Sequence, residues 1–297
     1  MIKFNLPGLY EHFDLNMQLL DDIAGMPEIF YPDIEIESFY GNFQFCIFDG
    51  GRIFCKYNHT CKEEIEFMVN EYNKRDVAVR LIFTNSMIQP IHYTDRFANL
   101  VLDICHNGKN EIVITNPGLE EYIRNKYPNF NIISSTTKCL NTKEAFIDEL
   151  KKDYDLICLD YNLNNKFDFL NSLTQEEKDK CEFLCNAICN PGCPNRKDHY
   201  RLNGIYYLNY GKPYSMEHCV IKGNTLHPLT TGSKNNISPE SIFNDYVPNG
   251  FNHFKLEGRT LSITENVCNF VRYLIKPEYQ QYYIVTTLNK LLENYHH

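Results

Sequence analysis

Short apolar strands alternate with amphipathic helices along most of this 297-residue chain. Runs typical of buried strands occupy residues 34–40, 77–83, 111–114, 130–133, 156–159 and 182–185. Helical periodicity fills the intervals, at residues 61–73, 93–106, 119–126, 142–151 and 174–180. This alternation is typical of a parallel sheet whose strands are joined by helices. The number of repeats predicts an α/β fold, a TIM-barrel-like parallel (β/α) barrel, rather than an open sheet.

We predict a single barrel-like domain over residues 1–297, with three segments added to the repeat. Residues 1–33 form a lead-in with an amphipathic helix from Phe13 to Ile23. Residues 181–237 comprise a cysteine-rich block and a long irregular loop, whose length is typical of a functional loop. A last strand is expected in residues 250–259, and residues 261–297 supply two closing helices that Pro277 separates.

The cysteine-rich block holds four of the chain's twelve cysteines between Cys181 and Cys193. Thiolates at this density are typical of a soft metal site or an iron–sulfur cluster. Asn190-Pro191-Gly192 interrupts any helix here and would turn the chain so that Cys189 and Cys193 face one point. Four thiolates also suit zinc, and buried cysteines often only fill a core, so both alternatives stay open.

Polar residues follow many of the predicted strands. In a parallel barrel the functional residues come from the carboxyl ends of the strands, so these positions could form one ring. The positions are Asn42, Asn85, Asn116, Ser135, Thr136, Asp160 and Asn186. Asn85, Asn116 and Asp160 are our candidate substrate-binding residues in this ring. Each position, taken singly, also fits an ordinary loop cap.

Lys255, Glu257 and Arg259 alternate along the last predicted strand and so share one of its faces. We predict that they line the mouth of the cavity that the cysteine block borders, with Phe254 and Leu256 facing the helices. Arg259 would then bind an anionic substrate through its planar fork. Two alternatives are a solvated edge strand and a Glu257–Arg259 pair that only closes the barrel. Arg52 could likewise bind an anion or simply be solvated.

The overall composition excludes some functions. The net charge of −9 argues against a broad nucleic-acid surface. No apolar run reaches the length of a membrane span, and the first residues lack the apolar core of a signal peptide. We therefore expect a cytoplasmic protein with no membrane partner, whose cysteines are reduced, buried or metal-bound rather than disulfide-linked.

The cysteine block and the run Lys255-Leu256-Glu257-Gly258-Arg259 together resemble the collagenase-like peptidase family U32. Strand ends reading Asn-Pro-Gly-Leu, Ser-Ser-Thr-Thr and Asp-Tyr-Asn agree with it, and the resemblance covers roughly residues 34–276. It implies a barrel-like fold and a 4Fe-4S cluster held by four cysteines. Members characterised as enzymes are implicated in oxygen-independent hydroxylation of ubiquinone precursors or RNA bases.

The family's ligand set includes a cysteine far downstream of the block. The resemblance therefore implies a metal site of Cys181, Cys189, Cys193 and Cys219, with Cys185 as the alternate member. Zinc is the alternative to the cluster at this site.

Three functions are considered. The first, implied by the resemblance, is an iron–sulfur protein that hydroxylates or oxidises a small molecule or an RNA base. The second is a binding or accessory protein that zinc or a cluster staples together without catalysis. A peptidase is the third, and neither His-Glu-x-x-His nor Gly-x-Ser-x-Gly occurs to support it. The sequence assigns no catalytic residue.

Overall fold

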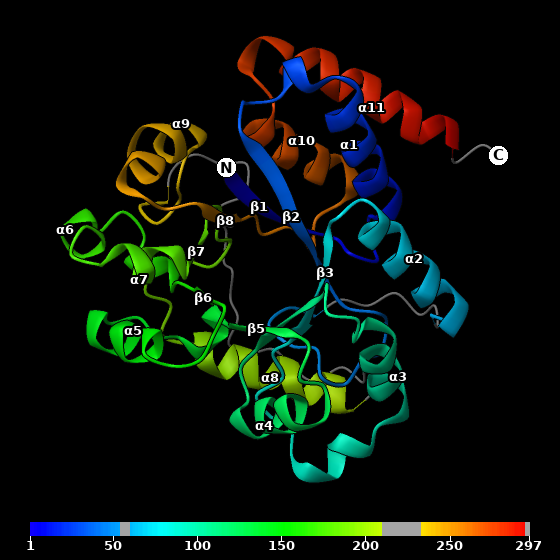
Figure 1. Ribbon diagram of the computed structural model, residues 1–297, viewed down its shortest axis with the longest axis vertical. Coiled ribbons are helices and arrows are strands. Elements are labelled where there is room, and N and C mark those ends of the chain that lie inside the picture. The colour runs from blue at the N-terminus through cyan, green and yellow to red at the C-terminus, as the bar shows by residue number, and fades with distance from the viewer. Residues whose placement is uncertain (54–59, 210–232, 295–297) are drawn as a thin grey trace.

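The computed structural model describes residues 1–53, 60–209 and 233–294. Eight parallel strands form a closed barrel, and helices surround it (Figure 1). The predicted α/β barrel is therefore confirmed. Each strand pairs with its neighbour in sequence, and the last strand pairs with the first to close the ring.

The strands are short, as the apolar runs predicted. Their bounds are β1 Ile2–Pro7, β2 Ile34–Gly41, β3 Ala78–Phe83, β4 Glu111–Ile114, β5 Asn131–Ser134, β6 Leu156–Cys158, β7 Cys181–Leu184 and β8 His253–Lys255. At the closing pair, Phe4 of β1 lies opposite Phe254 of β8.

Helices follow the strands on the outside of the barrel. They are α1 Phe13–Gly25, α2 Lys62–Lys74, α3 Arg96–Cys105, α4 Pro117–Lys126, α5 Lys143–Leu150, α6 Phe167–Leu170, α7 Gln175–Asp179, α8 Arg196–Leu208, α9 Pro239–Ser241, α10 Ile263–Leu274 and α11 Gln280–Asn294. Side-chain caps begin several of them. Thr142 accepts a hydrogen bond from Ala145, and Ser262 with Glu265 forms a capping box.

Alternation along the strands divides the core into two parts. Outward side chains such as Phe4 and Phe254 pack against the helices in the large core. Inside the barrel is a separate apolar cluster, formed by Tyr40, Ile82, Val113, Ile133 and Leu156. Burying one such side chain contributes about 1.5–3 kcal/mol, so both layers stabilise the ring.

A charged layer fills the barrel on the amino-terminal side of that cluster. Arg80 is fully buried and donates to Glu111 at 2.6 Å and to Glu182. Asn5 donates to Glu182 at 3.0 Å and accepts from Ser38. Burial opposes the charge of Arg80, but the surrounding carboxylates outweigh it and raise the pKa of Arg80. The charged layer therefore fills the barrel at the amino-terminal ends of the strands.

The structure departs from the sequence expectations in three segments. The lead-in contains a barrel strand, β1, which was not predicted. Lys3 and Asn5 point to the charged layer, so the segment has no apolar run that would indicate a strand. Residues expected to be irregular after Tyr200 continue as α8, whose polar and tyrosine-rich sequence lacks a clear apolar stripe. The last strand is shorter than residues 250–259.

In the described part of the chain, no helix combines the length and the apolar character that crossing a membrane requires.

Candidate functional site at the barrel mouth

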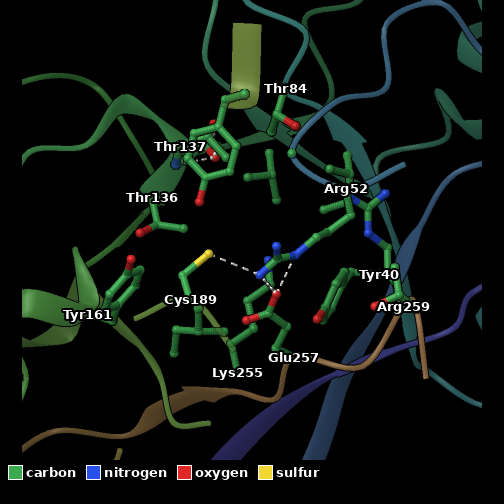
Figure 2. A pocket seen from close by; sticks show the side chains of 17 residues that line it. Tyr40, Arg52, Thr84, Thr136, Thr137, Tyr161, Cys189, Lys255, Glu257 and Arg259 are labelled. Carbon is green, nitrogen blue, oxygen red and sulfur yellow. Dashed lines mark hydrogen bonds and ion pairs between the residues drawn. The ribbon is translucent and has the colours of Figure 1, made fainter. Parts of the chain in front are cut away.

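A cavity of ≈ 80 Å³ lies at the carboxyl ends of the strands. Its inner end is formed by Tyr40, Ile82, Val113 and Lys255, which project inward from four strands. Leu184 of β7 also lines the cavity, and loop residues after the strands supply the wall and rim, namely Arg52, Thr84, Ser135, Thr136, Thr137, Tyr161, Cys189, Glu257, Arg259 and Thr260, with Gly51 and with Tyr200 of α8 (Figure 2). A cavity needs about 10–15 Å³ to hold one water molecule, so this cavity has room for a compact organic molecule.

Lys255 places an ammonium group in the inner end of the cavity. Its Nζ lies 4.1 Å from the centre of the Tyr40 ring and 3.9 Å from Glu182 Oε2. Within the described residues Nζ makes no hydrogen bond, because the Tyr40 hydroxyl is donated to the Leu256 carbonyl and Glu182 lies too far away. Burial lowers the pKa of Lys255, although the Glu182 charge opposes this effect.

Glu257 holds Arg52 at the rim. Arg52 Nε donates to Glu257 Oε1 at 2.6 Å, and the other carboxylate oxygen accepts from the Ile188 amide at 2.8 Å. The same guanidinium donates to Cys189 Sγ at 3.3 Å (Figure 2). Burial opposes the Arg52 charge, but Glu257 outweighs it and the pKa of Arg52 is raised. This contact fixes the Cys189 loop against the end of β8.

Arg259 is held by a different carboxylate. Its Nη1 donates to both Asp49 oxygens at 2.9 and 3.2 Å, and its Nη2 donates to the Gly50 carbonyl at 2.8 Å. Gly50 has to be glycine, because a Cβ there would lie 2.6 Å from the Thr84 carbonyl oxygen. Arg259 therefore locks the Asp49–Gly51 turn. Most of its fork is engaged by the protein itself.

Arg196 fastens α8 across the mouth. Its Nη1 donates to Asp160 at 2.5 Å, and its Nη2 donates to the carbonyl and hydroxyl oxygens of Thr136 at 2.9 and 3.0 Å. Its Nε donates to the Tyr200 hydroxyl at 2.9 Å, and its guanidinium lies over the Tyr161 ring. These contacts set the positions of three wall residues.

Comparison with known proteins agrees with this architecture. A solved structure described as "The Structure of the U32 Peptidase Mk0906" superposes with a TM-score of 0.51 and 14% sequence identity. The match covers 87% of this chain and 93% of that one. The chain shares the fold of a U32 peptidase. At this identity the likeness shows the fold alone. No protein-family model and no curated protein matches the sequence.

The structure brings together the charged residues that the sequence singled out in this U32-like barrel. Lys255, Glu257 and Arg259 line one cavity with Cys189, as we expected from their spacing. Phe254 and Leu256 pack outward in the large core. Two alternatives for Glu257 and Arg259 were a solvated edge strand and a pair that closes the barrel. The structure shows neither, because each of the two residues pairs with a residue of the loop after β2 and not with the other.

The three polar candidates at strand ends do not line the cavity. Asn85 is buried and donates to the Ile47 and Gly204 carbonyls, which ties α8 to the end of β3. Asn116 caps α4 by accepting from the Leu119 amide. Asp160 accepts from Arg196, and it also accepts from the Asn162 amide and so caps the short helix that carries Tyr161. All three position loops or helices in this structure.

The cysteines proposed as metal ligands are distributed over both faces of the barrel wall. Cys181 and Phe183 of β7 face outward, and Cys185, the residue after β7, is buried with them in the large core; Cys181 donates to the Glu177 carbonyl. Cys189 instead lines the cavity. Because side chains alternate along a strand, Cys181 and Cys185 are turned away from the mouth where Cys189 lies.

The described residues do not fit a 4Fe-4S cluster or a zinc ion by themselves. Cys193 is half-buried in the loop before α8, and Cys219 lies outside the described residues. Among the side chains that the structure describes, no three His, Cys, Asp or Glu residues converge as a metal site would require. The cluster and zinc therefore stay predictions from the sequence.

Several residues that line the cavity were not predicted from the sequence. Tyr40 ends an apolar strand and was indistinguishable from a core residue. Tyr161 and Tyr200 lie in loop and helix segments whose direction the sequence does not reveal. Arg52 was singled out in the sequence as a possible anion-binding residue, because it follows the Gly50-Gly51 pair directly after a buried segment, and it lines the cavity. An arginine placed after such a turn is worth testing as a site residue.

Proposed function

We propose that this chain is an enzyme that binds a small carboxylate-bearing molecule in the cavity at the barrel mouth. The observation that carries the proposal is the Lys255 ammonium, which faces the cavity without a hydrogen bond to any described residue. Arg52 and Arg259 line the same cavity, but each donates hydrogen bonds to a carboxylate. Among the described residues, Lys255 pairs with a carboxylate only through the 3.9 Å ion pair with Glu182. A buried ammonium without a hydrogen-bond acceptor is costly, and a bound anion would supply one.

The rest of the cavity supports a compact and partly polar ligand. Tyr40, Tyr161 and Tyr200 provide aromatic surface, while Ser135 and Thr136 provide hydroxyl groups. Ligand sites commonly combine apolar walls with a few polar groups that orient the ligand. The position at the carboxyl ends of the strands is where barrel enzymes have their active sites.

Other functions receive less support from the described residues. An iron–sulfur hydroxylase requires ligands that Cys181 and Cys185 do not provide from the outer face of β7. Peptide hydrolysis, the activity that the word peptidase implies for the structural neighbour, would need a base beside a nucleophile. Cys189 lies in the cavity against Arg52, and no histidine is among the described residues that line it. A stapled accessory protein would not need a cation facing an open cavity.

The test is calorimetric titration of the protein with L-lactate, a small acid without other charges. We expect binding that Lys255→Met reduces by roughly tenfold or more, the equivalent of about 1.4 kcal/mol for a lost charged contact. Lys138→Met is the control, because Lys138 is a half-buried lysine that donates to Glu149 and Tyr154 outside the cavity. Equal affinity in the Lys255 variant, with its circular dichroism unchanged, would refute the proposal.

A further inference from the structure

We propose that Lys255 is a nucleophile that forms an imine with the carbonyl carbon of the bound acid, so that the substrates are 2-oxo acids. This inference rests on the proposed function, because it adds a covalent step to the same cavity. It assigns a reaction to Lys255, which among the described residues is the one that places an amine at the inner end of the site.

The geometry leaves the amine open on one side and supported on the others. Lys255 is only 7% exposed, and its exposed part faces the cavity. The Tyr40 ring lies against Nζ on one side, and Glu182 of β7 lies on another. The cavity gives a ligand carbonyl a path to Nζ from the mouth. A nucleophile held in this way is oriented before the substrate arrives.

Glu182 provides a proton acceptor next to the amine. Its Oε1 accepts from Asn5 and Arg80, but its buried Oε2 has no hydrogen-bond partner. Oε2 is also the atom that lies 3.9 Å from Lys255 Nζ. A small side-chain movement or one bridging water would connect the two. A buried unpaired oxygen of this kind is unusual and is commonly associated with function.

The reaction balances without a redox partner. The ammonium of Lys255 first gives a proton to Glu182 or to water in the cavity. The amine lone pair then forms an N–C bond to the carbonyl carbon, and the carbonyl oxygen takes back the proton first released. The nitrogen, now bearing two hydrogens and a positive charge, gives one proton to Glu182 or water, which leaves a neutral carbinolamine. That same proton converts the hydroxyl into water, which leaves as the nitrogen lone pair forms the C=N bond. The product is an iminium ion on Lys255 plus one water molecule.

The charges around Nζ act in both directions, and burial decides the balance. Burial lowers the pKa of Lys255 and so favours the neutral amine that attacks a carbonyl. Glu182 and Cys158 favour the charged ammonium of Lys255. Arg80 and Arg259, which are positively charged, oppose it. Lysines that shift in this way are the ones used as Schiff-base nucleophiles.

The experiment uses pyruvate and a borohydride reductant, which converts an imine into a stable secondary amine. After digestion, mass spectrometry should find the adduct on the peptide containing Lys255. We expect modification of Lys255 to exceed that of Lys138 by about tenfold or more. Lys138 is the matched internal control, because burial lowers its pKa as well, yet it lies outside the cavity. Lys255→Arg should retain a cation for binding and lose the adduct.

The outcomes separate this inference from the proposed function. L-Lactate has the carboxylate but no carbonyl, so it should bind and give no adduct. If lactate and pyruvate both bind and Lys255 stays unmodified, imine formation is refuted and the proposed function stands. If neither acid binds, the proposed function itself fails. Adducts spread equally over Lys138 and Lys255 would also overturn the inference, because they would show no contribution from the cavity.

Discussion

Replacing Arg259 by lysine separates a structural role of this residue from a ligand-binding role. Arg259 makes three N–H···O contacts, two to Asp49 and one to the Gly50 carbonyl. A lysine keeps the charge but loses the planar fork, so one contact at best is retained. Two lost hydrogen bonds to a charged group, at about 1.5–3 kcal/mol each, predict a loss of about 3 kcal/mol at the lower end.

The assay for Arg259→Lys is thermal unfolding beside lactate titration. A loss of about 3 kcal/mol corresponds to a fall in melting temperature of about 6–12 °C for a large domain. Lactate affinity should stay within about twofold, because the Arg259 donors are already engaged by the protein. Arg75→Lys is the control. Arg75 makes an exposed pair with Glu71 and Asp21, and such pairs contribute about 0–1 kcal/mol.

Two results would refute this reasoning about Arg259. An unchanged melting temperature would show that the contacts with the Asp49–Gly51 turn do not stabilise the fold. A large fall in lactate affinity with normal stability would show that Arg259 binds the ligand directly, as the sequence alone suggested.

Three further predictions concern other parts of the barrel. Lactate binding should weaken as pH rises through the lowered pKa of Lys255, while trapping by pyruvate should increase; parallel changes in both would contradict the assignment. Burial opposes ionisation of Glu37, but His253 outweighs this effect and lowers the pKa of Glu37. The stability that the Glu37 carboxylate contributes is therefore complete above pH 4.5, and it is lost as the pH falls toward the lowered pKa of Glu37. Acid titration of Glu37→Gln by circular dichroism should show a smaller loss than the parent protein. In an anaerobic preparation, Cys181→Ser should leave the iron and acid-labile sulfide content unchanged, because this thiol faces the outer core, and a loss of either would place Cys181 in a metal site.

Most of the barrel could be predicted because its outer layer has a strong periodic signal. The strand predicted at residues 111–114 coincides with β4, and most other bounds differ by a residue or two. Outward strand residues and the helices that cover them are both apolar, so the pattern and the packing agree. β1 escaped for the opposite reason, since Lys3 and Asn5 face a charged layer that no local pattern reveals.

The candidate site was predictable only where a strand places its own residues. Lys255 and Glu257 share a face because side chains alternate, and the cavity contains both. The partners of those residues come from loops and could not be deduced in this way. Arg52 reaches Glu257 across 205 residues of sequence. Such a contact depends on how the loop after β2 turns, which Gly50 and its close approach to Thr84 decide.

The same alternation explains why Cys181 and Cys185 point away from the cavity. Cys181 of β7 and Cys185, which directly follows the strand, are four residues apart and therefore lie on one side of the barrel wall, while Glu182 and Leu184 lie on the other. Once Glu182 is required inside the barrel by Arg80, its neighbour Cys181 has to point outward. A buried charge thus sets the strand's orientation more strongly than a set of thiols does, because an unpaired buried charge costs several kcal/mol and a thiol packs readily in an apolar core. The charge pairs inside this barrel determine which strand residues face inward. On β8 side chains alternate in the same way, so Phe254 faces outward and Lys255 faces the cavity.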